Sequence, residues 1–112
     1  MEKLLLWEDV VKSHRVISGV STKEGLVRSL LCNPGSDQLY PNQIKKNTVT
    51  YYVGADTQTY CINALFRSLE EGNSFPIFEK LAVNKWKELG NYKIEAVEEK
   101  KGGFTGFSMT KV

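Results

Sequence analysis

The chain has 112 residues, a formal net charge of +2, 41% hydrophobic residues and 25% charged residues. Such values are typical of one ordinary globular domain and exclude an intrinsically disordered chain. No apolar run approaches the roughly 20 residues that cross a membrane, and residues 4–7 are too few for the apolar part of a signal peptide. The sequence therefore predicts a cytoplasmic protein.

The first predicted element is a short amphipathic helix within residues 3–12. Its apolar side chains recur at helical spacing: Leu4, Trp7, Val10 and Val11. We divide the chain accordingly into an N-terminal helix within residues 1–13 and a β-rich barrel over residues 14–112. The apolar face of the helix docks on this barrel or on a partner.

A strand is predicted at residues 15–20, with a break at Gly19, and a turn at residues 21–25. A second strand follows at residues 26–31 and a loop at residues 33–37. The next strand, residues 48–53, alternates β-branched and aromatic side chains, as a half-buried strand does. Val49, Tyr51 and Val53 are then expected to face the core. Thr48, Thr50 and Tyr52 are expected to face the other way.

The second half begins with a helix whose buried stripe is formed by Ile62, Leu65, Phe66 and Leu69 and which ends at Gly72. Three strands follow at residues 75–83, 92–98 and 104–112, with a hairpin at 100–103 and a bulge at Gly106. We place Phe75, Phe78 and Trp86 in the core. The order of elements predicts an α+β fold, a small, partly open and strongly curved β-barrel with two flanking helices.

The residue types that carry catalysis or bind metals are sparse. Cys32 and Cys61 do not form a disulfide framework and are interpreted as small buried hydrophobes. A lone His14 cannot build a metal site, and no nucleophile with a base or nuclease pattern is present. The sequence therefore predicts a binding domain that is not an enzyme and needs no cofactor.

The charges are distributed unevenly along the chain. Several cations fall in the first half, whereas the acidic residues Glu70, Glu71, Glu95, Glu98 and Glu99 fall in the second. This asymmetry indicates either one basic face or a generally solvated surface. If DNA lies on that face, the phosphate contacts are Arg15, Arg28, Lys45 and Lys46.

Several segments, taken in order, resemble the SET- and RING-associated (SRA, or YDG) domain, a branch of the PUA-like barrels. The resemblance covers about residues 14–112 and rests on the order and spacing of these segments. They are Ile17-Ser18-Gly19-Val20, Leu39-Tyr40-Pro41-Asn42-Gln43, Thr50-Tyr51-Tyr52-Val53-Gly54, Asn63-Ala64-Leu65, Glu71-Gly72-Asn73-Ser74-Phe75-Pro76-Ile77-Phe78, Leu89-Gly90-Asn91-Tyr92-Lys93-Ile94 and Gly103-Phe104.

The resemblance implies a reader that flips a modified base, most simply a modified cytosine, out of double-stranded DNA into an aromatic pocket. Tyr40 and Tyr52 match the two rings that sandwich the base, although without the resemblance they would be interpreted as packing residues. Asn42 and Gln43 stand where the family has acidic residues, and Thr50 completes the predicted pocket. A carboxylate only accepts hydrogen bonds, whereas an amide donates and accepts them.

The family's long intercalating finger after the strand at 48–53 is missing here. Ile17, Ser18 and Lys23 are the remaining candidates to fill the gap that a flipped base leaves in the duplex.

The expected function is the specificity domain of a prokaryotic modification-dependent restriction endonuclease. A nuclease or NTPase domain of the same protein or complex is its expected partner, and no membrane is involved. Two alternatives remain open. One is a reader of unmodified DNA, or a PUA-like RNA-binding domain, without base flipping. The other is an interaction domain that docks through its N-terminal helix.

Overall fold

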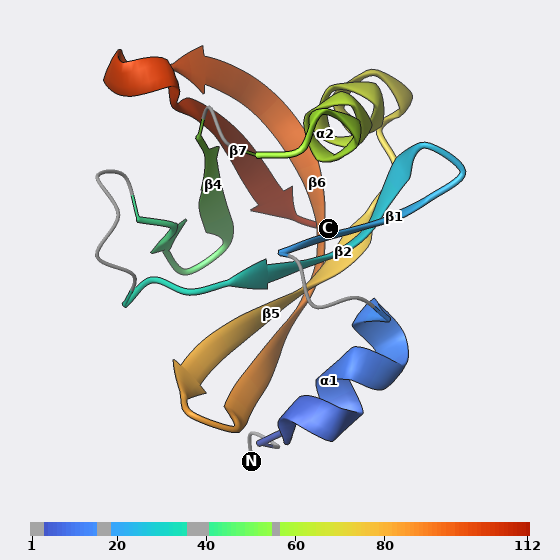
Figure 1. The fold of residues 1–112 in the computed structure, drawn as a ribbon, viewed down its shortest axis with the longest axis vertical. Coiled ribbons are helices and arrows are strands. Elements are labelled where there is room, and N and C mark those ends of the chain that lie inside the picture. The colour runs from blue at the N-terminus through green and yellow to red at the C-terminus, as the bar shows by residue number, and fades with distance from the viewer. Residues whose placement is uncertain (1–3, 16–18, 36–40, 55–56) are drawn as a thin grey trace.

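The computed structural model describes residues 4–15, 19–35, 41–54 and 57–112 (Figure 1). The elements follow in the order helix, four strands, helix, three strands, with a short 3-10 turn before the last strand. They are α1 Trp7–His14, β1 Val20–Lys23, β2 Leu26–Cys32, β3 Gln43–Ile44, β4 Thr48–Val53, α2 Thr59–Glu71, β5 Phe75–Ala82, β6 Lys85–Glu99, η1 Lys101–Gly103 and β7 Thr105–Lys111. Neither helix in the described part of the chain combines the length and apolarity that a membrane crossing needs.

All seven strands belong to one sheet, in the order β1-β2-β5-β6-β7-β4-β3. β2 and β5 are parallel, and every other neighbouring pair is antiparallel. The sheet is strongly curled, with α2 above it and α1 below it in the view of Figure 1. The curled sheet is a half-barrel that stays open between its edge strands, β1 and β3. The predicted α+β class and the partly open, curved barrel are confirmed.

The core lies on the inner face of this sheet. Along β4 the predicted alternation is confirmed, because Val49, Tyr51 and Val53 are buried. On α2 the buried side chains are Cys61, Ala64, Leu65 and Ser68, so the buried stripe was predicted only in part. Ile62 and Leu69 are partly buried at its margin. Phe66, with 42% of its surface exposed, makes an edge-to-face ring contact with the buried Phe107.

α1 begins at Trp7, later than predicted, because the residues before it join the sheet. Leu5 exchanges both backbone hydrogen bonds with Trp86, at 2.8 and 2.9 Å, and Asn84 Oδ1 accepts a hydrogen bond from Trp7 N at 2.7 Å. Val10, fully buried, packs against Trp86 and Phe78. The apolar face of α1 is therefore occupied by the protein's own sheet.

Of the strand predicted at residues 15–20, residues 16–18 lie outside the described part of the chain, and Arg15 and Gly19 are not in a strand, whereas Val20 begins β1. α1 continues to His14, whose Nδ1 forms a buried 2.6 Å hydrogen bond with Ser29 Oγ, and Arg15 then adopts a left-handed conformation that ends the helix. The turn predicted over residues 21–25 is shorter in the structure and comprises Glu24 and Gly25. Both have positive φ, as a two-residue hairpin turn requires.

The bulge predicted at Gly106 is also misplaced. β6 is far longer than the predicted 92–98, and the register of its pairing with β7 shifts between Ile94 and Ala96. Gly106 pairs regularly with Tyr52, and a Cβ at this glycine would lie 2.7 Å from Tyr52 Cε1. The glycine therefore makes room for the Tyr52 ring.

Ser68 connects α2 to the sheet, and its replacement by alanine should destabilise the fold. Its Oγ, in a fully buried side chain, accepts a hydrogen bond from Val27 N at 2.9 Å. Ser68→Ala leaves that buried N–H without its acceptor, which costs about 1–3 kcal/mol. Denaturant titration should show this loss, whereas Ser108→Ala, at an exposed β7 position, should change the free energy of unfolding little. Equal effects of the two variants would contradict the assigned role of Ser68.

Candidate nucleic-acid interface

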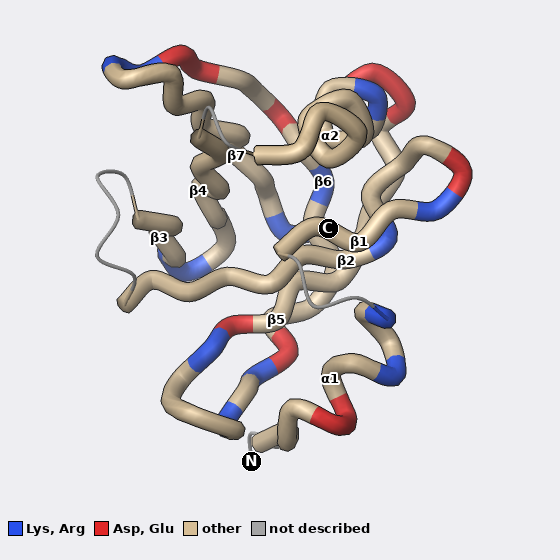
Figure 2. Tube along the Cα trace, viewed as in Figure 1, with Lys and Arg blue, Asp and Glu red and all other residues tan. Residues whose placement is uncertain are grey.

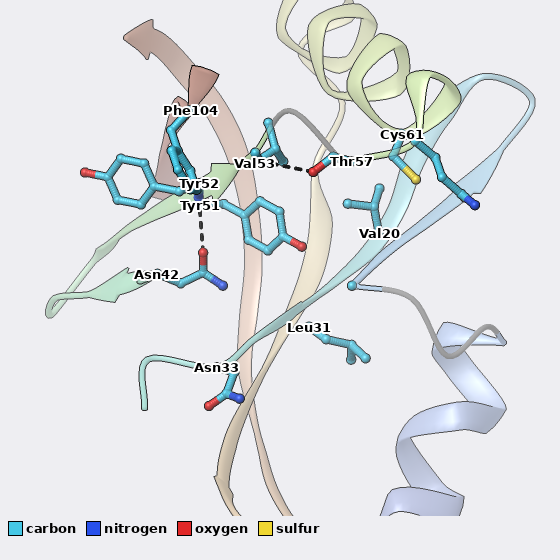
Figure 3. Close-up of a pocket in the computed structure, with 13 residues that line it drawn as sticks. Val20, Leu31, Asn33, Asn42, Tyr51, Tyr52, Val53, Thr57, Cys61 and Phe104 are labelled. Atoms are coloured by element: carbon cyan, nitrogen blue, oxygen red, sulfur yellow. Dashed lines mark hydrogen bonds between the residues drawn. The ribbon is translucent and has the colours of Figure 1, made fainter. Parts of the chain in front are cut away.

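A cavity of about 500 Å³ lies at the open seam of the half-barrel (Figure 3). The start of β1 and the end of β2 form one side, and the end of β4 and the first turn of α2 form the other. In the described part of the chain its lining residues are Gly19, Val20, Leu31, Asn33, Asn42, Tyr51, Tyr52, Val53, Gly54, Thr57, Gln58, Cys61 and Phe104. We call it the seam cavity.

Tyr51 spans the seam from β4 toward β1. Its ring points into the interior, with the hydroxyl directed to the side of Val20 and Leu31 (Figure 3). A Cβ at Gly19 would collide with this hydroxyl, so the glycine allows the two edges to approach. Burial raises the pKa of the Tyr51 hydroxyl, with smaller contributions from Cys32 and Cys61, so the hydroxyl stays protonated and neutral at physiological pH.

Asn42 is fixed beside this ring by a hydrogen bond to the backbone. Its Oδ1 accepts from Tyr52 N at 3.1 Å, and only 8% of the residue's surface is exposed. Its amide nitrogen points toward the cavity (Figure 3). The Tyr52 ring points away from the Tyr51 ring, because successive side chains of a strand lie on opposite faces.

The structure brings together some of the predicted pocket residues. Asn42 and Tyr52 line the seam cavity, whereas Gln43 and Thr50, which pair across β3 and β4, are not among its described lining residues. Gln43 is exposed because Ile44, its neighbour in the two-residue strand, takes the inward position. Tyr40, Ile17 and Ser18 lie outside the described residues.

Sequence reasoning missed several lining residues. Tyr51 was expected only in the core, and it is buried as expected while also forming a wall of the cavity. Thr57 and Gln58 directly precede α2. Thr57 Oγ1 accepts a hydrogen bond from Gly54 N at 3.1 Å, and Gln58 is the N-cap residue of the helix. The sequence feature that could have indicated this end of the cavity is Gly54, which directly follows the alternating strand at residues 48–53.

The seam cavity is electrically neutral in its described lining. Its polar groups are amides and hydroxyls, with no Asp, Glu, Lys or Arg among the lining residues. Aromatic and apolar walls with a few placed polar groups are typical of small-molecule and base-binding sites, and the volume falls within the usual range of about 300–1,000 Å³. The cavity therefore suits an uncharged, flat ligand.

A basic hollow of about 350 Å³ lies between the end of α1 and the β1–β2 hairpin. It is lined by Lys12, Ser13, Arg15, Lys23 and Arg28. Within the described residues, none of these four cations has a carboxylate within the 4.0 Å of an ion pair. Their mutual repulsion is thus uncompensated in the protein alone, and the hollow is suited to an anion.

Lys45 and Lys46 belong to a different hollow, of about 510 Å³, beside the β3–β4 turn. Lys87 and Lys111 also line it, together with Glu79 and Glu88. One of the two interpretations of the charge distribution was a single basic face; the described cations instead form two groups, on the sides of the two edge strands (Figure 2). The seam cavity lies between these edges.

The two cysteines are free and buried, as predicted. Burial raises the pKa of the Cys32 thiol to about 12, with a smaller contribution from Glu79. Among the described residues no group of three or more His, Cys, Asp and Glu side chains could hold a metal ion.

The raised pKa values make stability depend on alkaline pH. Tyr51 and Cys32 lose their protons at a higher pH in the folded chain than in the unfolded chain. Their contribution to the free energy of unfolding is therefore complete below the unfolded pKa values, about 10 for Tyr and about 8.5 for Cys, and is lost as the pH rises above them. The free energy of unfolding should therefore fall as pH rises from about 8.5 to 11. Tyr51→Phe should flatten this fall in urea denaturation series. An unchanged slope would contradict the assignment to Tyr51.

Comparison with solved structures identifies the fold as that of SRA domains. The SRA domain of SUVH5 in complex with hemimethylated CG DNA has a TM-score of 0.77 and 17% identity, over 93% of this chain and 79% of that chain. The SUVH5 SRA domain bound to fully hydroxymethylated CG DNA has a TM-score of 0.67 and 16% identity, over 93% and 81% of the two chains. The predicted SRA-like barrel is confirmed as a fold.

A further similar structure is that of a longer protein. SUVH6 of Arabidopsis thaliana has a TM-score of 0.70 and 18% identity over 93% of this chain, which spans 23% of the SUVH6 chain. Neither the models of protein families nor the curated protein sequences give a match.

Proposed function

We propose that the chain binds double-stranded DNA that carries a modified base and takes that base into the seam cavity. The observation that carries this proposal is a neutral cavity of about 500 Å³, with aromatic and amide walls, at the open seam of an SRA fold. A modified cytosine is the first candidate, because similar SRA domains were solved with methylated and hydroxymethylated DNA.

The aromatic residues would supply the binding energy for the base. Stacking on an aromatic side chain contributes about 1–3 kcal/mol per base, which is comparable to the few kcal/mol that base flipping costs. Tyr51 and Tyr52 are the described aromatic candidates on β4. The sandwich with Tyr40, and the filling of the duplex gap by Ile17, Ser18 or Lys23, are proposed from the family resemblance.

The two basic hollows would contact the DNA backbone. They lie on the sides of the two edge strands, and the seam cavity lies between those strands. A duplex placed over the seam would meet cations on either side of the inserted base. Arg15, Lys23 and Arg28 would bind phosphates near β1, and Lys45 and Lys46 would bind them near β3.

The wider role we propose is recognition rather than catalysis. The chain would serve as the specificity domain of a modification-dependent restriction endonuclease, acting in the cytoplasm. The partner would be a nuclease or NTPase domain in the same protein or complex. The lining of the seam cavity supports this role, because its described residues offer amide, hydroxyl and aromatic groups that can bind a base, and they include no His, Asp, Glu or Lys that could act as a general base beside the Cys61 thiol.

A binding titration tests the proposed function. Labelled duplexes with unmodified, 5-methyl or 5-hydroxymethyl cytosine, and an RNA duplex, are titrated at two salt concentrations. Tighter binding of a modified duplex at both concentrations is the expected result. Equal, steeply salt-dependent binding of all duplexes would instead support the reader of unmodified DNA or RNA. If no nucleic acid is bound, the remaining alternative is an interaction domain. Such a domain would not dock through the apolar face of α1, because the protein's own sheet already covers that face.

A further inference from the structure

The hydrogen bond between Asn42 and Tyr52 fixes which end of the Asn42 amide faces the seam cavity. A backbone N–H can only donate, so the side-chain atom 3.1 Å from Tyr52 N is the oxygen. The NH₂ group is then directed toward the cavity, as Figure 3 shows. Within the described residues this NH₂ group has no acceptor, in a residue with 8% of its surface exposed.

The other polar groups of the described lining are less constrained. Asn33 and Gln58 are exposed, so their amides can rotate in solvent. The Tyr51 hydroxyl stays protonated and can either donate or accept. Asn42 therefore presents to the cavity a polar group whose orientation is fixed by a hydrogen bond in a largely buried residue, and this group is a donor.

We propose that Asn42 determines the specificity of the seam cavity by donating a hydrogen bond to the O2 atom of the inserted pyrimidine. This inference rests on the proposed function and deepens it. The O2 atom is an acceptor in both cytosine and uracil, whereas the 4-position carries a donor in cytosine and an acceptor in uracil. The ligand class is therefore a 5-substituted pyrimidine that is recognised by its acceptors, with no requirement for the 4-amino group.

The variant Asn42→Asp reverses the polarity of this group with little change of shape. One carboxylate oxygen keeps the hydrogen bond from Tyr52 N, and the other replaces the NH₂ group with an acceptor. The variant should then repel the O2 atom and weaken the binding of any pyrimidine in the cavity, modified cytosine and modified uracil alike. Because the added charge weakens all DNA binding, the informative quantity is the ratio of two affinities within each protein.

The probes are two duplexes that differ only at one base, 5-hydroxymethylcytosine or 5-hydroxymethyluracil. For the unaltered protein we expect the affinities for the two duplexes to lie within about threefold of each other. The reason is that Asn42 contacts no group that is present in cytosine and absent from uracil. For Asn42→Asp we expect both modified duplexes to lose about tenfold or more of their affinity relative to a duplex with unmodified cytosine, because one specific base contact is lost. Thermal unfolding of the variant checks that it is folded.

Two results would overturn the inference. One is a preference of about tenfold or more for the cytosine duplex in the unaltered protein, which needs no variant and holds even if Asn42→Asp fails to fold. The other is a folded Asn42→Asp variant that keeps the preference of the unaltered protein for the two modified duplexes over a duplex with unmodified cytosine. If neither duplex is bound more tightly than one with unmodified cytosine, the proposed function itself fails, and the inference fails with it.

Discussion

Replacing Tyr52 with alanine should lower the affinity for a modified duplex by about tenfold or more, because stacking on one aromatic ring contributes about 1–3 kcal/mol. The same variant should bind an unmodified duplex almost as the unaltered protein does. Tyr52 is one of the lining residues of the seam cavity and is only partly buried, with its ring over Gly106, so its removal should not empty the core. Fluorescence anisotropy with labelled duplexes measures both affinities.

A matched control for this variant is Tyr60→Ala, which removes the same kind of ring. Tyr60 is exposed on α2 and is not among the lining residues of the seam cavity. The affinity of this control for either duplex should stay close to that of the unaltered protein. Weakening of modified and unmodified duplexes by the same factor in Tyr52→Ala would show that Tyr52 does not bind the modified base.

Neutralising the hollow beside α1 should have the second large effect, and it should not depend on modification. The double variant Lys23→Gln and Arg28→Gln should weaken binding to modified and unmodified duplexes equally. The slope of log affinity against log salt should decrease by about 0.9 for each phosphate that the variant no longer neutralises. Because these cations have no ion-pair partner in the described structure, the variant should also unfold at an equal or higher temperature.

The control double variant is Lys93→Gln and Lys101→Gln, which removes the same charge from positions outside both hollows. Both lysines are exposed on β6 and η1. The salt slope should then stay near that of the unaltered protein. If both double variants reduce the slope of log affinity against log salt equally, DNA binding depends on the overall charge of the protein rather than on the hollow.

Local sequence patterns predicted the elements whose conformation depends on near neighbours. β4 follows from its period of two, because only one face of the strand can enter the core. The end of α2 at Gly72 follows from a residue that adopts the left-handed conformation readily. The end of α1 was predicted less well, because the buried hydrogen bond between His14 and Ser29 joins residues of two different elements.

The geometry of the site depends on contacts that spacing does not reveal. The strand at 48–53 predicted that Tyr51 faces the core, but its place at the seam results from the curling of the sheet toward Gly19. The curled sheet also explains why the basic residues form two groups, because its strand order places Lys23 and Lys45 near opposite edges. Asn42 was selected through the family resemblance, whereas its donor orientation required the hydrogen bond to Tyr52.

The insertion of a modified base beside Asn42 is the central claim, and side-chain amide NMR tests it most directly. The Asn42 NH₂ resonances of ¹⁵N-labelled protein, assigned with the Asn42→Asp variant, are followed during titration with matched modified and unmodified duplexes. We expect a large shift of these resonances with the modified duplex and little change with the unmodified one. Unchanged Asn42 resonances at saturation with the modified duplex, or identical shifts with both duplexes, would contradict insertion of the modified base at this site.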